Sequence, residues 1–391
     1  MIDRSISLIL PVKNESKESI KTTLDSLEKI YSRDNFSKLY IVYPLNDQVS
    51  KKSLKEILSE TKYSYPIEVV ESPNTDGLKA LDLNYVLYNY AEEDIIGVFD
   101  ADDFIDTEIL TKVREAFKKG YVAVSPRVYR YRPSLLGRLV YVETVIWYDI
   151  WINILQRLNL HTPLSGEGLF VKTSVVKSLG GFPPELAEDA ALSVLLGLKG
   201  YMYGYIDSYV IELAPRSIKA LIKQRIRWYK GHLKIFLNLL RTKLFLKSIS
   251  RIFATYIMIF TPSIIYLAPV SLEIYNLRHV LRNTQDPYSL IKYFIEDSMS
   301  LLTVPTQLIN GYYNDLLRIF LASLLYSYIA LLVILIYQLI KRHGRIIGLR
   351  EIVSISIISI FMLPIYWLFL SIAFILSLKP SGNKWYRTER R

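Results

Sequence analysis

Three aspartates, Asp100, Asp102 and Asp103, follow an apolar run at Ile95–Phe99 that predicts a buried strand. Parallel sheets bind their ligands at the carboxyl ends of strands. Carboxylates crowded at such an end repel one another unless a cation neutralises them. Oxygen ligands suit Mg²⁺ or Mn²⁺, and proteins hold Mg²⁺ with one or two carboxylates plus substrate phosphates. This cluster therefore predicts a metal–diphosphate site. The alternative is an acidic turn that caps the following helix, where acids favour the helix dipole.

A second acidic pair, Glu188 and Asp189, lies at the start of a predicted helix, Ala187–Leu198. A carboxylate in a desolvated cleft can acquire the pKa that a general base needs. The alternative is a pair of helix N-terminal acids stabilised by the macrodipole.

A predicted helix at Ile218–Leu244 carries Gln224, Arg227 and Trp228 at spacings that share one face. A guanidinium fork binds two diphosphate oxygens, and an indole offers a platform for a sugar or packing for a pocket. The alternative is a basic amphipathic helix that rests on lipid. Three other cations of this helix are expected to point elsewhere and serve that lipid contact: Lys223, Arg225 and Lys230.

Strand-like runs alternate with helix-like patterns in the first half of the chain. This alternation predicts right-handed crossovers and an α/β fold with a mainly parallel sheet. The predicted strands are Ile6–Leu10, Leu39–Tyr43, Ile67–Val70, Ile95–Phe99 and Val122–Ser125. The predicted helices are Glu18–Ile30, Val49–Ser59, Leu78–Tyr90 and Glu108–Lys118.

Composition narrows the possible partners. The 391 residues include no cysteine, which excludes disulfides and thiolate chemistry, and the four histidines show no zinc spacing. The net charge is +11. Beside long apolar runs, this charge indicates an anionic lipid surface rather than nucleic acid. No signal peptide is visible, so the N-terminal domain is expected in the cytoplasm of a multi-pass cell-membrane protein.

The second part of the chain is expected to lie in a membrane. Basic residues at Lys341–Arg350 and after Leu378 both favour the cytoplasmic side, which conflicts with three simple crossings. A re-entrant hairpin at Pro364 or an undetected crossing within 276–315 would resolve the conflict, and we favour a cytoplasmic tail. The segments long enough to span a bilayer are Ile252–Tyr275, Ile319–Ile340 and Ile352–Leu378.

The predicted organisation has three parts. Residues 1–215 form a catalytic domain, 216–248 an interfacial helix, and 249–391 a transmembrane region with a basic tail. A further aromatic-rich helix, Leu135–Leu158, fits either the membrane interface or the protein core.

Taken together, the ordered motifs resemble the membrane-integrated family-2 glycosyltransferases, a group that includes cellulose, chitin and hyaluronan synthases. The resemblance covers about residues 6–228, and a second matching segment lies at the C-terminus. The strings that carry it are PVKNE, GLKALDLN, FDADD, SGEGLF with GGF, AEDAAL, QRIRW and the tail KWYRTER.

The resemblance implies a GT-A-type domain that transfers a sugar from a nucleotide-diphosphate donor with inversion. It implies Asp189 as the base that deprotonates the acceptor hydroxyl, and Asp100 and Asp102 as ligands of Mg²⁺ or Mn²⁺. Asn84 is expected to orient backbone beneath the site. The implied substrate contacts are Glu15, Asp47, Lys79, Asp100, Glu188, Gln224, Arg227, Trp228, Trp385 and Thr388.

The motifs leave alternatives for the base of the donor nucleotide and for the chemical class of the acceptor. Only Asp47 follows the second strand where the family shows an Asp-rich turn, so UDP is preferred over GDP without being established. The acceptor could be a growing polysaccharide, or a glycolipid or polyprenyl phosphate. Because few helices are available to line a channel, a homo-oligomer could supply more. Outside the enzyme class, a non-catalytic scaffold or transporter remains an alternative.

Overall fold

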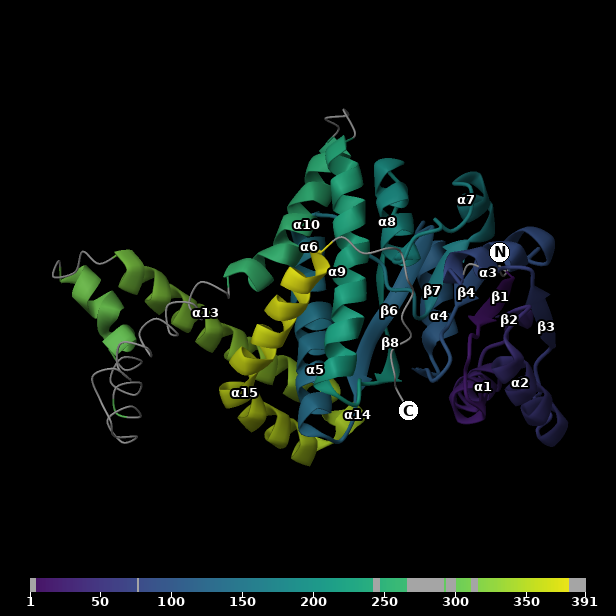
Figure 1. Ribbon diagram of the computed structural model, residues 1–391, viewed down its shortest axis with the longest axis horizontal. Helices are drawn as coiled ribbons and strands as arrows, with labels where there is room; N and C mark the ends of the chain where they lie inside the picture. Colours follow the sequence, from purple (N-terminus) through teal and green to yellow (C-terminus); the bar gives the residue numbers. More distant parts are fainter. Residues whose placement is uncertain are drawn as a thin grey trace. The chain divides into compact units, whose positions relative to one another are not determined.

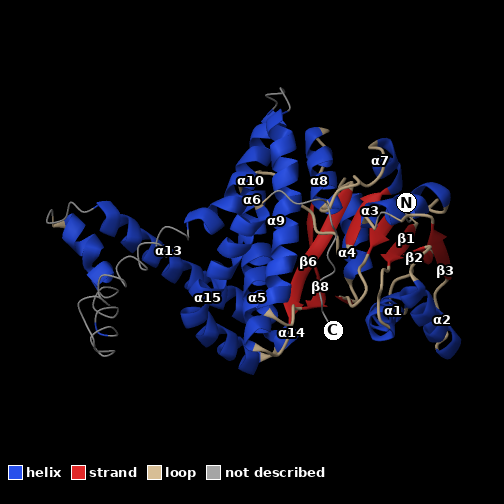
Figure 2. Cartoon of the chain, viewed as in Figure 1, coloured by secondary structure: helices blue, strands red, loops and turns tan. Residues whose placement is uncertain are grey.

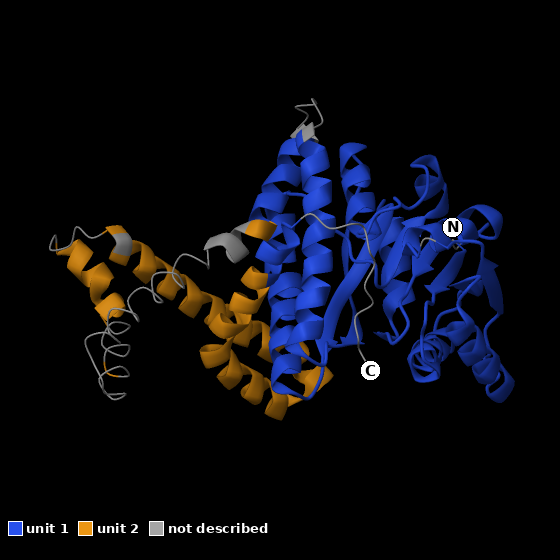
Figure 3. Ribbon diagram, in the orientation of Figure 1, with its two compact units in different colours: residues 1–258, 373–391 blue, residues 259–372 orange. Residues whose placement is uncertain are grey.

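The computed structural model describes residues 5–75, 77–241, 247–265, 292, 300–310 and 316–379. The chain divides into two compact units, Met1–Met258 with Ala373–Arg391, and Ile259–Ile372 (Figure 3).

One eight-stranded sheet forms the centre of the first unit (Figure 1, Figure 2). Its strand order is β3-β2-β1-β4-β7-β6-β8-β5. Strands β1 to β4 pair in parallel, β7 runs antiparallel to both of its neighbours, and β6 pairs in parallel with β8. The strands are β1 (Ile6–Pro11), β2 (Lys38–Pro44), β3 (Ile67–Ser72), β4 (Ile95–Val98), β5 (Phe104–Ile105), β6 (Ala123–Tyr131), β7 (Leu169–Lys172) and β8 (Tyr203–Leu213).

Helices cover both faces of this sheet, as expected when parallel strands are joined by crossovers. Side chains alternate along β1, so Leu8 and Leu10 join the core under α1, α2 and α4, while Ile9 joins the core under α3, α7 and α8. The helices are α1 (Lys17–Tyr31), α2 (Gln48–Glu60), α3 (Lys79–Asn89), α4 (Ile109–Lys118), α5 (Leu135–Val145), α6 (Ile152–Arg157), α7 (Thr173–Ser178), α8 (Glu188–Leu198) and α9 (Ile218–Arg241).

The predicted strands and helices of the first half are present with ends shifted by a few residues. Val122–Ser125 is the start of the longer β6, and β7 and β8 join the sheet from beyond the predicted range. The predicted helix at Leu135–Leu158 is α5 and α6 joined by a π-helical segment, η1 (Ile146–Trp151). Its buried side chains, such as Tyr141 at 0% exposure, pack as a core helix against β6.

The helices described after α9 are α10 (Lys247–Ile265), α13 (Leu316–Gln338), η2 (Leu339–His343), α14 (Gly344–Ile347) and α15 (Leu349–Ser377), together with a short apolar helix at Ser300–Ile309. By length and composition, two stretches could cross a membrane, Arg318–Ile347 and Leu349–Ser377. They match the second and third predicted spans, and α15 continues through Pro364 as one helix, which argues against a broken hairpin there. The first predicted span falls partly outside the described residues.

Candidate active site

The DADD turn follows β4 at the carboxyl edge of the sheet, as predicted. Thr23 of α1 fixes it: the Thr23 hydroxyl donates to the Asp100 carbonyl at 3.0 Å and accepts from the Asp103 amide at 2.9 Å. The Asp103 carboxylate accepts from the Asp100 amide at 2.9 Å. Asp103 is fully buried, and burial, followed by the charges of the neighbouring acids, raises its pKa well above the usual value. Asp103 thus shapes the turn.

Lys79, the first residue of α3, joins the two acidic motifs. Its Nζ lies 2.6 Å from Asp100 Oδ1 and 3.6 Å from Glu188 Oε1. Burial by itself lowers the pKa of Lys79, but the attraction of these carboxylates outweighs it and the pKa is raised. A permanent cation therefore lies between the strand-end acids and the helix that carries Asp189.

Asp100 also approaches two glutamates that sequence reasoning missed. Carboxylate oxygens of Asp100, Glu167 and Glu212 lie within 4.8 Å of one another. Three hard oxygen donors at this separation fit Mg²⁺ or Mn²⁺. Arg130 of β6 pairs with both glutamates, its Nη2 2.8 Å from Glu167 Oε1 and its Nε 2.6 Å from Glu212 Oε2.

A signal for these residues existed in the sequence. Glu167 lies inside the quoted SGEGLF string, and Arg130 and Glu212 are charged positions flanked on both sides by aromatic or aliphatic residues. Such charges are rarely buried unless they are paired. Asp102, the second predicted metal ligand, is 4% exposed with φ +80 and is not in the trio with Asp100. Its role as a ligand stays a prediction.

Asp189 is half-buried in the first turn of α8. Burial, then the negative charges of Glu188 and Glu167, raises its pKa to about 7. A Cβ at Gly166 would lie 3.2 Å from Asp189 Oδ2, so the glycine leaves room beside the carboxylate. A carboxyl group that titrates near neutral pH can accept a proton from a hydroxyl and pass it on.

Asp47 and Glu15 meet at the carboxyl ends of β1 and β2. Asp47 caps α2, accepting from the Ser50 amide at 3.0 Å, and its other oxygen accepts from the Asn14 amide at 2.6 Å. The Glu15 amide donates to the Ser50 hydroxyl at 2.9 Å. Asp47 is only 4% exposed, and in the structure its carboxylate holds the PVKNE turn. Nucleoside contacts by these two acids stay predictions.

Asn84 of α3 holds the glycine loop before α8. Its Nδ2 donates to the Phe182 carbonyl at 2.8 Å and its Oδ1 accepts from the Phe182 amide at 2.7 Å. Asn84 thus holds backbone as expected, and the placement of that backbone beneath the active site stays a prediction.

The helix with the Q-x-x-R-W motif is α9, and one expectation about it is wrong. Arg225 does not face lipid: it is 2% exposed and its Nη2 lies 2.5 Å from Glu143 Oε2. Arg225 precedes Trp228 by three residues and so shares its face of the helix, and Glu143 of α5 pairs with Arg225 on that face. Gln224 is 1% exposed, and Arg227 and Trp228 are half-buried.

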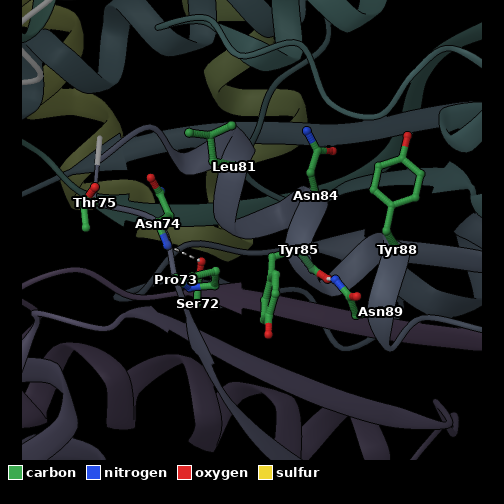
Figure 4. Close-up of a pocket in the computed structure, with 9 residues that line it drawn as sticks. All are labelled: Ser72, Pro73, Asn74, Thr75, Leu81, Asn84, Tyr85, Tyr88 and Asn89. Atoms are coloured by element: carbon green, nitrogen blue, oxygen red, sulfur yellow. Dashed lines mark hydrogen bonds between the residues drawn. The ribbon is translucent and has the colours of Figure 1, made fainter.

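A pocket of about 440 Å³ lies between α3 and the residues that follow β3 (Figure 4). Its lining is uncharged and includes Asn74, Tyr85 and Tyr88. The carboxylates and Lys79 are absent from its lining, so the chemistry of the site is assigned from the charged cluster. The predicted contacts Trp385 and Thr388 lie outside the described residues.

Comparison of the sequence with known protein families identifies the family of this chain. The profile described as "Glycosyl transferase family group 2" matches residues 95–377, more than half of the chain, and "Glycosyl transferase family 2" matches residues 7–164. The chain belongs to glycosyl transferase family group 2. The predicted enzyme class, a family-2 glycosyltransferase, is confirmed.

Two curated relatives of this glycosyltransferase are informative. The poly-beta-1,6-N-acetyl-D-glucosamine synthase of Staphylococcus epidermidis is 30% identical over 243 residues, 60% of this chain and 56% of the relative. The probable glycosyltransferase YdaM of Bacillus subtilis is 25% identical over 274 residues, 66% of this chain and 62% of the relative. The chain thus spans little more than half the length of the curated relatives it matches.

A solved structure shares the fold of this glycosyltransferase. The mannosyltransferase PcManGT from Pyrobaculum calidifontis, in complex with GDP-Man and Mn²⁺, superposes with a TM-score of 0.52 at 17% identity. The match covers 97% of this chain and 89% of that one. It supports the predicted GT-A-type, mainly parallel sheet.

Proposed function

We propose that this glycosyltransferase moves a sugar from a nucleotide-diphosphate donor, preferably a UDP-sugar, to the hydroxyl of a membrane-associated polysaccharide. The observation that carries the proposal is Asp189, whose pKa is raised to about 7 beside a cluster with paired carboxylates and a lysine. The poly-N-acetylglucosamine synthase relative supports a polysaccharide as the acceptor.

In this mechanism the oxygen of the acceptor hydroxyl attacks the anomeric carbon of the donor sugar, and Asp189 takes the proton of that hydroxyl. The nucleoside diphosphate leaves from the opposite face, so the anomeric configuration is inverted. Lys79 and Arg227 supply fixed positive charge for the diphosphate. Gln224 and Trp228 contact the acceptor, and Glu15 and Asp47 the nucleoside. Trp385 and Thr388 of the tail close over the bound donor.

A divalent cation fits the carboxylates present. Asp100, Glu167 and Glu212 offer three oxygens within 4.8 Å, and Asp102 is the further predicted ligand. Bound Mg²⁺ or Mn²⁺ would stabilise negative charge on the leaving diphosphate. PcManGT, which shares the fold, was solved with Mn²⁺.

The proposed setting is the cytoplasmic face of the cell membrane, with a multi-pass anchor. The two long apolar stretches support it, as does the contact between Tyr229 of α9 and Phe374 near the end of α15, with ring centroids 5.4 Å apart. That contact brings the last turn of α15 to the helix that carries Q-x-x-R-W. A homo-oligomer would add helices around a polymer.

A second candidate acceptor is a lipid, either a glycolipid or a polyprenyl phosphate. The observation in its favour is that only two stretches of the described residues are long and apolar enough to span a membrane. Two helices are few for lining a polysaccharide channel.

The test is a screen of nucleotide sugars with purified protein in lipid, reading released nucleotide and product mass. UDP-N-acetylglucosamine and GDP-mannose are compared, each with Mg²⁺, Mn²⁺ or chelator. Transfer from a UDP-sugar to a growing chain is expected. Asp189→Asn should retain donor binding while transfer slows by at least ~10²-fold, the usual scale for a lost general base. Loss of donor binding in that variant would contradict the role of Asp189, and product found only on lipid would favour the second acceptor.

A further inference from the structure

The Trp228 indole lies beneath two buried cations. The guanidinium carbon of Arg225 is 4.1 Å from the ring centroid and that of Arg130 is 4.7 Å. Both separations are well within the range of cation–π attraction. Arg225 comes from α9 itself and Arg130 from β6, so a helix and the sheet both contribute to fixing the same ring.

Glu143 of α5 holds Arg225 in place. Arg225 Nε donates to Glu143 Oε1 at 3.0 Å and Nη2 to Oε2 at 2.5 Å, which is a two-point pairing. A third bond runs from Arg225 Nη1 to Gln224 Oε1 at 2.5 Å. The Arg225 side chain is only 3% exposed, so its plane is set by these partners.

Arg130 connects the same ring to the acidic cluster. Its pairs with Glu167 and Glu212 place it beside the carboxylates that approach Asp100. A chain of contacts therefore runs from the strand-end acids through Arg130 to Trp228. Two ion-paired guanidinium groups therefore contact the half-buried indole.

We propose that Arg225 and Glu143, with Arg130, are positioning residues that lock the Trp228 indole and thereby set how the acceptor sugar binds. The proposal rests on the proposed function, in which Trp228 contacts the acceptor. A guanidinium already over the ring occupies area that a stacked sugar would need. The locked indole accordingly presents its edge, in a fixed orientation, to the acceptor sugar.

The sharpest variant is Arg225→Lys, which keeps the charge but loses the planar fork and its two-point pairing. Transfer is measured with UDP-N-acetylglucosamine and a β-1,6-linked N-acetylglucosamine pentasaccharide in lipid. The KM for the pentasaccharide should rise by about 10-fold while the KM for the donor stays within about 2-fold, given the strength of a desolvated cation–π contact. Glu143→Gln, which keeps shape and hydrogen-bonding oxygen, should give a smaller shift in the same direction.

Lys223→Gln is the matched control, because Lys223 lies on the exposed side of the same helix and should leave both KM values unchanged. Equal increases in both KM values for Arg225→Lys, or no increase in either, would overturn the proposal.

A second measurement does not depend on activity. Subtracting the near-ultraviolet circular dichroism of a Trp228→Phe derivative from each protein isolates the band of Trp228, which requires a fixed ring. That band should weaken in Arg225→Lys and persist in Lys223→Gln. A full band in Arg225→Lys would overturn the positioning role. Absence of transfer by the wild type from every nucleotide sugar would instead refute the proposed function.

Discussion

At the scale of single residues, we expect the protonation of Asp189, the proposed base, to set the pH range of transfer. A base must be ionised, and burial with nearby carboxylates raises its pKa to about 7. The rate should therefore fall about tenfold per unit as pH drops below 7 and level off above it. Glu188→Gln removes the negative charge that raises the pKa of Asp189 most, so that pKa should fall and the acid limb should move to lower pH. A pH–rate profile at saturating donor checks this, and an acid limb that stays in place would contradict it.

The proposed metal site is also tested one residue at a time. Asp100→Asn should weaken Mn²⁺-dependent donor binding by at least ~10-fold, a common scale for disturbed metal sites. Asp102→Asn should do the same if Asp102 is the second ligand. Donor affinity is titrated with Mn²⁺ and with chelator. Unchanged Mn²⁺ stimulation in Asp102→Asn would leave the ion to Asp100, Glu167 and Glu212, whereas unchanged stimulation in Asp100→Asn would refute the site.

At the scale of elements, the glycine loop precedes α8, the helix that carries Asp189. Gly180 and Gly181 both have positive φ, +89 and +91. A Cβ at Gly181 would lie 2.4 Å from Asn84 Oδ1, whereas one at Gly180 meets nothing within 4 Å. Gly180→Ala should therefore report backbone strain alone, and Gly181→Ala strain plus displacement of Asn84.

The matched pair gives a quantitative expectation. Gly180→Ala should lower the free energy of unfolding by about 1–2 kcal/mol for a left-handed backbone. Gly181→Ala should lower it by a further ~1–3 kcal/mol, because the partly buried hydrogen bonds between Asn84 and Phe182 are lost. Denaturant unfolding of the purified protein measures both. Equal losses would show that Asn84 gives way at little cost.

At the scale of the whole molecule, the side of the membrane that holds the tail decides whether the tail can reach the site. Because the chain contains no cysteine, Ser381→Cys gives one reporter thiol. An impermeant thiol reagent should label it only after lysis, since the basic residues after Leu378 favour the cytoplasm. Labelling of intact cells would contradict this topology.

Truncation before Trp385 tests the tail as a lid. Transfer should fall while the unfolding transition is retained, because a closing segment excludes water from the donor. Transfer by the truncated chain at the full rate would leave Asp189 and Arg227 to act without a lid.

The sequence alone determined the parts that depend on local pattern. Alternating apolar runs predicted β1 to β4 and the helices between them, since periodicity along a strand or helix decides which face is buried. The acids after β4 were placed at a sheet edge for the same reason. The order of motifs was sufficient to predict the family.

Only the tertiary structure decided which distant charges meet. Arg130, Glu167 and Glu212 come together because β6 and β8 join the sheet beyond β7, and long-range pairing leaves no mark in local periodicity. Arg225 faces inward because Glu143 of α5 lies opposite it, although the same spacing would suit a lipid-facing cation. A helix pattern specifies which residues share a face, but the partner that neutralises a charge on that face is set by the packing of other elements.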